Sequence, residues 1–291
     1  MESLAQTGIS YSDEHLTGEF VQWLVDTTIR PQASIVLMSA PPPPSADLEA
    51  AVRAAWKELE EDPRFVAEAQ RRNYNADQAL ADLRRRMEQP VTATLDQRIA
   101  AKLTLKYTVT REKRAFVHRV NGTPILMIPP AQAAVSANAR ATLYAIYVVV
   151  DVLSVVAAAA GVYITQGKEA LSKSLATPLQ RFLTWIGGNT AEAAELERLQ
   201  KAGKKVDVIV KVLSWLRGTV NLKEVVTAFF DSLRWWEKAV TVVQFVASIT
   251  VTIASFGASL TVKLVQLGAA IAVLFADVVL LVGALTKPAM S

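Results

Sequence analysis

Long stretches with almost no charge constrain this chain more than any other feature. The 48 residues from 239 to 286 carry only two charges, Lys263 and Asp277. The 27 residues from 141 to 167 carry one, Asp151. A helix that crosses a membrane needs about 20 predominantly apolar residues. The sequence therefore predicts three helices long enough to span a bilayer, in segments 141–165, 239–262 and 264–286.

The last two of these segments are expected to pair as a C-terminal helical hairpin. A tight turn is predicted near residues 257–263, and each arm would be about 33–36 Å long at 1.5 Å per residue, enough to cross a bilayer. Many small residues in both arms favour close packing of helices in lipid. A buried hairpin at the centre of a soluble bundle is the alternative, and the lengths favour the membrane interpretation.

Charged and aromatic residues flank the hairpin. Arg234, Trp235, Trp236 and Lys238 precede the uncharged stretch, and Lys287 follows the last apolar segment. Tryptophan favours the headgroup region of a bilayer, and lysine and arginine extend their charges to the same depth. These five residues are predicted to anchor the hairpin at the membrane surface.

Three charged residues would lie inside the membrane: Asp151, Lys263 and Asp277. On insertion scales an aspartate at the bilayer centre costs about 2.5–3.5 kcal/mol, so it needs an interior face, a water-filled path or a basic partner. Lys263 and Arg140 are the partners that the sequence suggests. Equally, each aspartate could lie at a solvated edge of a protein that is only partly buried.

The first part of the chain is predicted to mix helices and strands. Helical spacing appears at 48–59, after Pro63 and at 76–88, whereas alternation at 103–109 and apolar runs at 115–120 and 125–128 predict strands around an Asn121-Gly122 turn. The predicted fold class is mostly α, with a small N-terminal α+β domain followed by a hydrophobic helical bundle. The α+β domain would cover residues 1–130, in a regulatory or targeting role. The membrane-inserting domain would cover 140–291.

Charge is unevenly distributed over the N-terminal part. Residues 1–62 hold 3 basic and 11 acidic residues, and residues 63–119 hold 13 basic and 6 acidic. Opposite charges in consecutive segments neutralise each other within one folded unit. Arg71-Arg72 and Arg84-Arg85-Arg86 are therefore assigned to a solvated helix face, ahead of a patch for anionic lipid. No nucleic-acid partner is expected, because no recognised binding motif accompanies the arginines.

No enzyme is expected. The chain has no cysteine, and its two histidines, His15 and His118, stand in no recognised catalytic or metal-binding motif. No cofactor or metal is predicted. The N-terminus has neither a basic region nor an apolar core typical of a signal peptide. We therefore expect synthesis in the cytoplasm without a cleaved signal peptide, followed by membrane association on activation or release.

Amphipathic, lysine-bearing segments followed by a long apolar hairpin resemble the pore-forming domain of colicins and, more broadly, α-helical pore-forming toxins. The resemblance covers residues 190–286, and segment 239–286 carries most of it. It implies an apolar hairpin that is shielded in a soluble bundle and later inserts into a membrane. The function expected from it is permeabilisation of a bilayer, anionic in composition, by a homo-oligomer that converts from a soluble form.

Two other functions remain open from the sequence. A resident integral membrane protein with three spans would place residues 1–139 and the C-terminus on opposite sides of the bilayer. A soluble, self-assembling structural subunit would cover its apolar helices with neighbouring copies. The three differ in whether the protein leaves the membrane fraction without detergent and in its size in solution.

Overall fold

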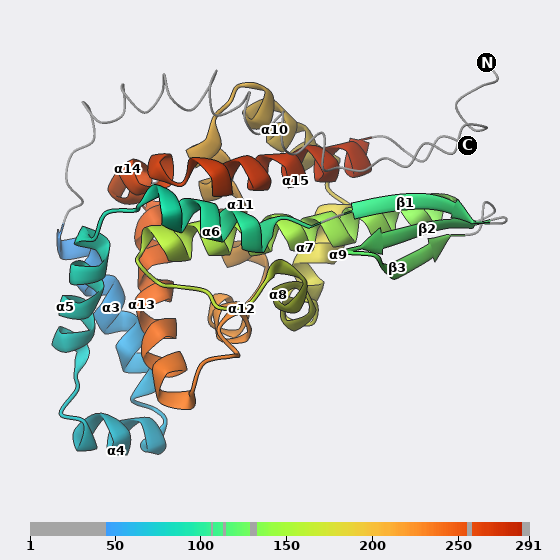
Figure 1. The fold of residues 1–291 in the computed structure, drawn as a ribbon. Helices are drawn as coiled ribbons and strands as arrows, with labels where there is room; N and C mark the ends of the chain where they lie inside the picture. Colours follow the sequence, from blue (N-terminus) through green and yellow to red (C-terminus); the bar gives the residue numbers. More distant parts are fainter. Residues whose placement is uncertain (1–44, 106, 113–114, 129–132, 255–257, 287–291) are drawn as a thin grey trace.

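The computed structural model describes residues 45–105, 107–112, 115–128, 133–254 and 258–286, and most of the described chain is helical (Figure 1). Four helices come first: α3 (Ser45–Leu59), α4 (Pro63–Arg71), α5 (Ala76–Glu88) and α6 (Ala93–Leu103). Three strands follow: β1 (Tyr107–Glu112), β2 (Ala115–Val120) and β3 (Thr123–Ile128). The rest is helical: α7 (Ala133–Ala159), α8 (Lys168–Leu175), α9 (Gln180–Gly187), α10 (Thr190–Lys201), α11 (Lys205–Thr219), α12 (Leu222–Phe229), α13 (Trp235–Ala254), α14 (Ala258–Gln266) and α15 (Gly268–Thr286).

Side-chain caps fix the starts of the early helices. The Asp62 carboxylate accepts the backbone N–H of Arg64, and Pro63 occupies the first turn of α4, where a missing N–H costs nothing. Asn75 and Gln78 form a reciprocal capping box at the start of α5. The helices at 48–59, after Pro63 and at 76–88 are thereby confirmed.

Helix α7 lies at the centre of the bundle. From Ala145 to Ala160 every residue is buried, because α15, α8 and α9 pack around it together with α6, α11 and α14. Its most extensive partner is α15, which crosses above it in Figure 1. The two helices run antiparallel, since the end of α7 at Gly161 and Lys263 just before α15 both contact Arg86.

A second core lies between the early helices and α13. Buried residues of α3, α4 and α5 pack against Val243, Ala247 and Val251 on one face of α13. Helix α6 continues from there along α15. We call residues 45–103, which comprise α3 to α6, the strap, because they run over α13, α14 and α15 in turn. The strap residues in this core are Leu48, Val52, Trp56, Phe65, Ala69, Ala79, Leu80 and Leu83.

The three strands form an antiparallel sheet in the order β1-β2-β3. Asn121 and Gly122 connect β2 to β3 with φ angles of 51° and 81°, the positive values of a type I′ hairpin turn. The extensive contacts of these strands are with one another. In Figure 1 the sheet lies at the end of the bundle away from α13.

The prediction of an N-terminal α+β domain is wrong. The early helices do not pack on the strands to form a domain of their own; they share their core with α13 and contact α15. The strand predicted at 103–109 begins only at Tyr107, and Leu103 is the buried last residue of α6. The helical spacing is the stronger signal here. It places Leu95, Ile99 and Leu103 on one face of α6, and this face outweighs the strand-like alternation that begins at Leu103.

The predicted C-terminal hairpin is also wrong as a packed pair. A separate helix, α14, stands between the two apolar arms where a tight turn was expected. Helix α13 then packs on α3, whereas α15 packs on α7. The physical reason lies in the strap, because Lys263 donates to backbone carbonyl oxygens of the strap and Asp96 caps the start of α15.

Replacing Gly161 by alanine should destabilise the fold. Gly161 has φ +72°, and a Cβ there would lie 2.8 Å from both the Cβ and the carbonyl oxygen of Arg86. Left-handed backbone and overpacking together predict a loss of about 2–4 kcal/mol in the free energy of unfolding, measured by urea denaturation. Gly218→Ala is the control, because its Cβ would meet nothing within 4 Å in α11. A loss no greater than that of the control would contradict the close contact between the strap and α7.

Candidate functional site

Three charged side chains meet inside the bundle. Lys168, the first residue of α8, donates from Nζ to Oδ2 of Asp151 on α7 at 2.8 Å and also to Oδ2 of Asp277 on α15. Lys168 and Asp151 are fully buried, and the Asp277 side chain is 13% exposed. The Lys168 ammonium also lies 5.1 Å from the centre of the Tyr147 ring. We call Asp151, Lys168 and Asp277 the ion cluster.

Sequence reasoning found both aspartates and missed their partner. Lys263 and Arg140 were the bases suggested, but Lys263 instead binds the carbonyl oxygens of Arg86 and Gln89. The apolar face of α8 was the feature of the sequence that could have identified this partner. Lys168, Leu171, Ser172 and Leu175 are all buried, with the i, i+3, i+4, i+7 spacing of one buried face.

The ion cluster holds two carboxyl groups and one ammonium group. Burial lowers the pKa of Lys168, but its two acidic neighbours outweigh this effect and raise the pKa above its ordinary value, so the ammonium stays charged. Among the described residues, Asp151 Oδ1 is buried with no hydrogen-bond partner. A buried ion cluster with an unpartnered oxygen is costly, so this arrangement is weak support for stability.

Polar contacts join the strap to each of the three helices that it crosses. The buried Gln244 of α13 accepts from Arg86 at 3.1 Å and donates to the carbonyl oxygen of Ala79 at 3.0 Å. Lys263 of α14 donates to the Gln89 carbonyl oxygen at 2.7 Å. Asp96 accepts the first backbone N–H groups of α15, those of Ala269 and Ala270, at 2.8 and 2.9 Å.

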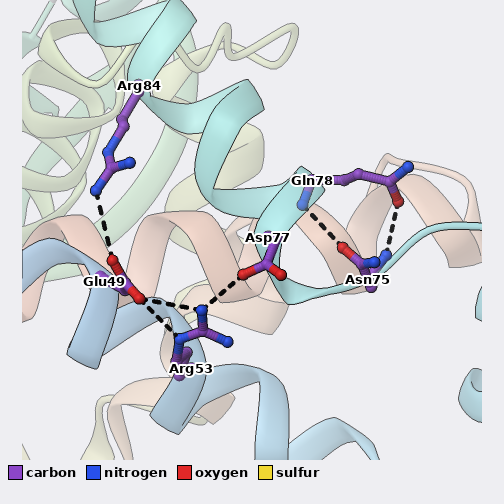
Figure 2. A network of polar contacts seen from close by, with 6 residues as sticks. All are labelled: Glu49, Arg53, Asn75, Asp77, Gln78 and Arg84. Carbon is purple, nitrogen blue, oxygen red and sulfur yellow. Dashed lines mark hydrogen bonds and ion pairs between the residues drawn. The ribbon is translucent and has the colours of Figure 1, made fainter.

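The outer surface of the strap is polar. Figure 2 shows Arg53 between Glu49 and Asp77, at 3.0 and 2.7 Å, with Arg84 at 3.8 Å from Glu49. Such exposed ion pairs contribute about 0–1 kcal/mol each. They make this face compatible with water while the apolar inner face covers α13. Three of the other arginines noted in the sequence have acidic partners too: Arg71 and Arg72 pair with Glu68, and Arg85 with Asp82. Arg86 instead donates to Gln244.

The proposed anchor residues lie in different surroundings. Trp235 is 41% exposed, whereas Trp236 packs against Phe65 at 5.3 Å and is partly buried. Arg234 is exposed, and Lys238 pairs with Asp231 at 2.9 Å. Lys287 lies outside the described residues. Trp235 and Arg234 are therefore the exposed members of the set.

A second buried lysine has no such partners. Lys205 begins α11, and among the described residues its ammonium has no hydrogen-bond partner, although it lies 5.8 Å from the centre of the Phe275 ring of α15. Burial lowers the pKa of Lys205 to about 8. The contact with Phe275 compensates only partly for the loss of water.

By length and composition, three helices are able to cross a membrane: 141–159 in α7, all of α13 and all of α15. Within these, 89%, 61% and 50% of the most apolar stretch is buried. Among the described residues no group of three or more metal-binding side chains is present. Comparison with protein families, curated proteins and solved structures finds no match, so the function has to be inferred from this geometry.

Replacing Lys168 by methionine should destabilise the protein strongly. The variant keeps most of the side-chain volume but leaves two carboxylates without their cation, which predicts a loss of about 3–5 kcal/mol in the free energy of unfolding. Lys173→Met on the same helix is the control, since Lys173 is 76% exposed and pairs with the exposed Glu169. Equal effects in chemical denaturation would show that the ion cluster does not hold α7, α8 and α15 together.

Replacing Lys205 by methionine should stabilise the protein, by about 1–3 kcal/mol near neutral pH, because a charged group without a partner leaves the interior. Below pH 8 the ammonium is charged in both the folded and the unfolded chain, and burial penalises only the folded one. As pH rises from 8 to 10.5, the folded chain releases the proton first and the penalty fades. The gain should therefore shrink at about pH 10 in parallel melts of both proteins. A constant gain would contradict the lowered pKa.

Proposed function

We propose that this chain is a membrane-inserting, pore-forming protein that folds first in a soluble form and permeabilises a bilayer after the strap is released. The burial of α7 carries the proposal. This helix is long and apolar enough to span a membrane, yet 89% of its most apolar stretch is covered by other helices of the same chain. Four of the helices that cover it, α6, α8, α9 and α11, have 8 to 15 residues, too few to span a bilayer beside it.

The covering helices have faces of two kinds. Helix α10 buries Ala193, Leu196 and Leu199, while Glu195 and Arg198 pair on its outer side at 2.7 Å. The strap has the same division between an apolar inner and a polar outer face. Contacts of the inner face are apolar and non-directional, so lipid can replace them with little loss. The helices that would insert keep their own backbone hydrogen bonds in either environment.

The contacts that Gln244, Lys263 and Asp96 make between the strap and the bundle are among those that lipid cannot replace. They lie at the middle of α13, on α14 and at the first turn of α15. Separation of the strap would break these contacts and also uncover the apolar face of α13 that carries Val243, Ala247 and Val251. In this proposal the strap shields the apolar helices in place of the predicted α+β domain.

We assign the first contact with a bilayer to the N-terminal end of α13. Trp235 is among the few large apolar side chains that are exposed in the described residues, and Arg234 is exposed beside it. A tryptophan next to an arginine suits the headgroup region of an anionic bilayer. The proposal shares with α-helical pore-forming toxins the storage of an apolar helix inside a soluble bundle.

The exposed face of α15 favours oligomerisation as part of the same function. Val279 is 41% exposed, and a Cβ at Gly283, one turn further along, would meet nothing within 4 Å. A small residue beside an exposed apolar one permits close approach of a second helix, both in water and in lipid. A soluble assembly subunit would use this face as well, and membrane activity separates the two functions.

Weakening the strap should accelerate membrane permeabilisation. Asp96→Ala removes both acceptors from the first turn of α15, a loss of about 0.5–2 kcal/mol for a helix cap. We expect faster dye release from phosphatidylglycerol-containing vesicles by this variant than by the unchanged protein, both purified without detergent.

Asp77→Ala is the matched control, since Asp77 is an exposed acid of the strap that contacts Arg53 within the strap itself. It should release dye at the unchanged rate. If neither the unchanged protein nor Asp96→Ala releases dye while both are folded, the membrane function is wrong. If both variants accelerate release equally, the strap contact with α15 is not what restrains insertion.

A further inference from the structure

The two aspartates of the ion cluster stand at the middle of their apolar helices. Asp277 is nine residues from each end of α15, and Asp151 is ten and eight residues from the ends of the apolar segment 141–159. At 1.5 Å per residue these separations are about 12–15 Å. That is close to half of the roughly 30 Å hydrocarbon thickness of a bilayer. Either helix, once inserted, would place its carboxylate near the bilayer centre.

The antiparallel pairing places both carboxylates at one level. The chain just after α7 and the chain just before α15 meet at Arg86. Asp151 lies eight residues before the end of α7, and Asp277 lies nine residues after the start of α15. Both carboxylates accordingly reach the same ammonium group, that of Lys168. If α7 and α15 insert as the pair seen here, two carboxylates face each other halfway across the membrane.

In the folded protein the cation between the two aspartates is Lys168, which belongs to a helix that cannot span a membrane. Helix α8 has eight residues, too few to span a bilayer, and its outward residues Glu169 and Lys173 are charged. Neutralising one buried aspartate would need only one lysine. A second carboxyl group shares this lysine, and Asp151 Oδ1 remains buried without a partner among the described residues. The position therefore offers a cation a carboxyl oxygen that Lys168 does not use.

We propose that Asp151 and Asp277 form a cation-binding site at the centre of the inserted α7–α15 pair, that Lys168 fills this site in the soluble form, and that the pore conducts monovalent cations in preference to anions. This inference rests on the proposed membrane function. Carboxylate oxygens attract small hard cations and repel chloride. Two carboxylates without a third ligand suit a passing monovalent ion better than a resident metal.

Ion selectivity in planar bilayers tests the site. Across a KCl gradient, the unchanged protein should pass K⁺ in preference to Cl⁻. Asp277→Asn and Asp151→Asn should each lower the K⁺ to Cl⁻ permeability ratio by about tenfold, as expected when one charge leaves a site of low dielectric constant. Each variant keeps one carboxylate for Lys168, so folding of the soluble form is retained and is checked by thermal melts. Asp277→Glu should restore the ratio.

Asp207→Asn is the matched control, because Asp207 is an exposed acid on α11 that pairs with Lys204 at 3.6 Å. Its permeability ratio should equal that of the unchanged protein. Conductance with an unaltered ratio in both Asp151→Asn and Asp277→Asn would overturn the cation site and leave the membrane function standing. No conductance from any folded variant would overturn both.

Discussion

Two carboxylates buried between apolar helices need a cation, and the position of that cation determines how the rest of this chain is arranged. Lys168 joins Asp151 to Asp277, and so it ties α15 to α7 instead of to α13, its neighbour in sequence. Because the pair is antiparallel, α15 has to start where α7 ends. The strap passes that place, which is why Arg86 contacts both Gly161 and Lys263 there.

The strap makes an apolar bundle compatible with water because its inner face is apolar and its outer face is polar. Its inner residues share a core with Val243, Ala247 and Val251 of α13, while its outer residues form exposed ion pairs such as those of Arg53. Apolar contacts of the inner face are strong in sum but have no directional requirement. Directional contacts define where the strap sits. They include those of Gln244, Lys263 and Asp96, and that of Lys102 with the carbonyl oxygen of Ile164.

The sequence predicts the apolar helices well and their pairing poorly. The length of the nearly uncharged stretches identifies 141–159, α13 and α15, because a helix of that length has to be apolar both in a protein core and in a bilayer. The pairing of the helices depends on contacts between residues that are distant in sequence, such as Lys168 with Asp277. Because the two C-terminal apolar segments are neighbours in the chain, the sequence suggested the wrong pair. The buried face of α8 and the Leu95, Ile99, Leu103 spacing of α6 were readable signals. The Asn121-Gly122 turn was predictable because its positive φ angles depend on local residues alone.

Two features that oppose stability lie against the α7–α15 pair. Among the described residues, Lys205 is buried beside Phe275 without a hydrogen-bond partner, and Asp151 has a buried oxygen without one. A protein selected only for a stable core gains nothing from a buried lone ammonium or an unpartnered carboxyl oxygen. A protein that has to open gains from both, since each lowers the free energy needed to separate α15 from its cover. In the proposed function, the two aspartates that hold Lys168 in the folded bundle would attract cations in a membrane, so one pair of aspartates serves both states.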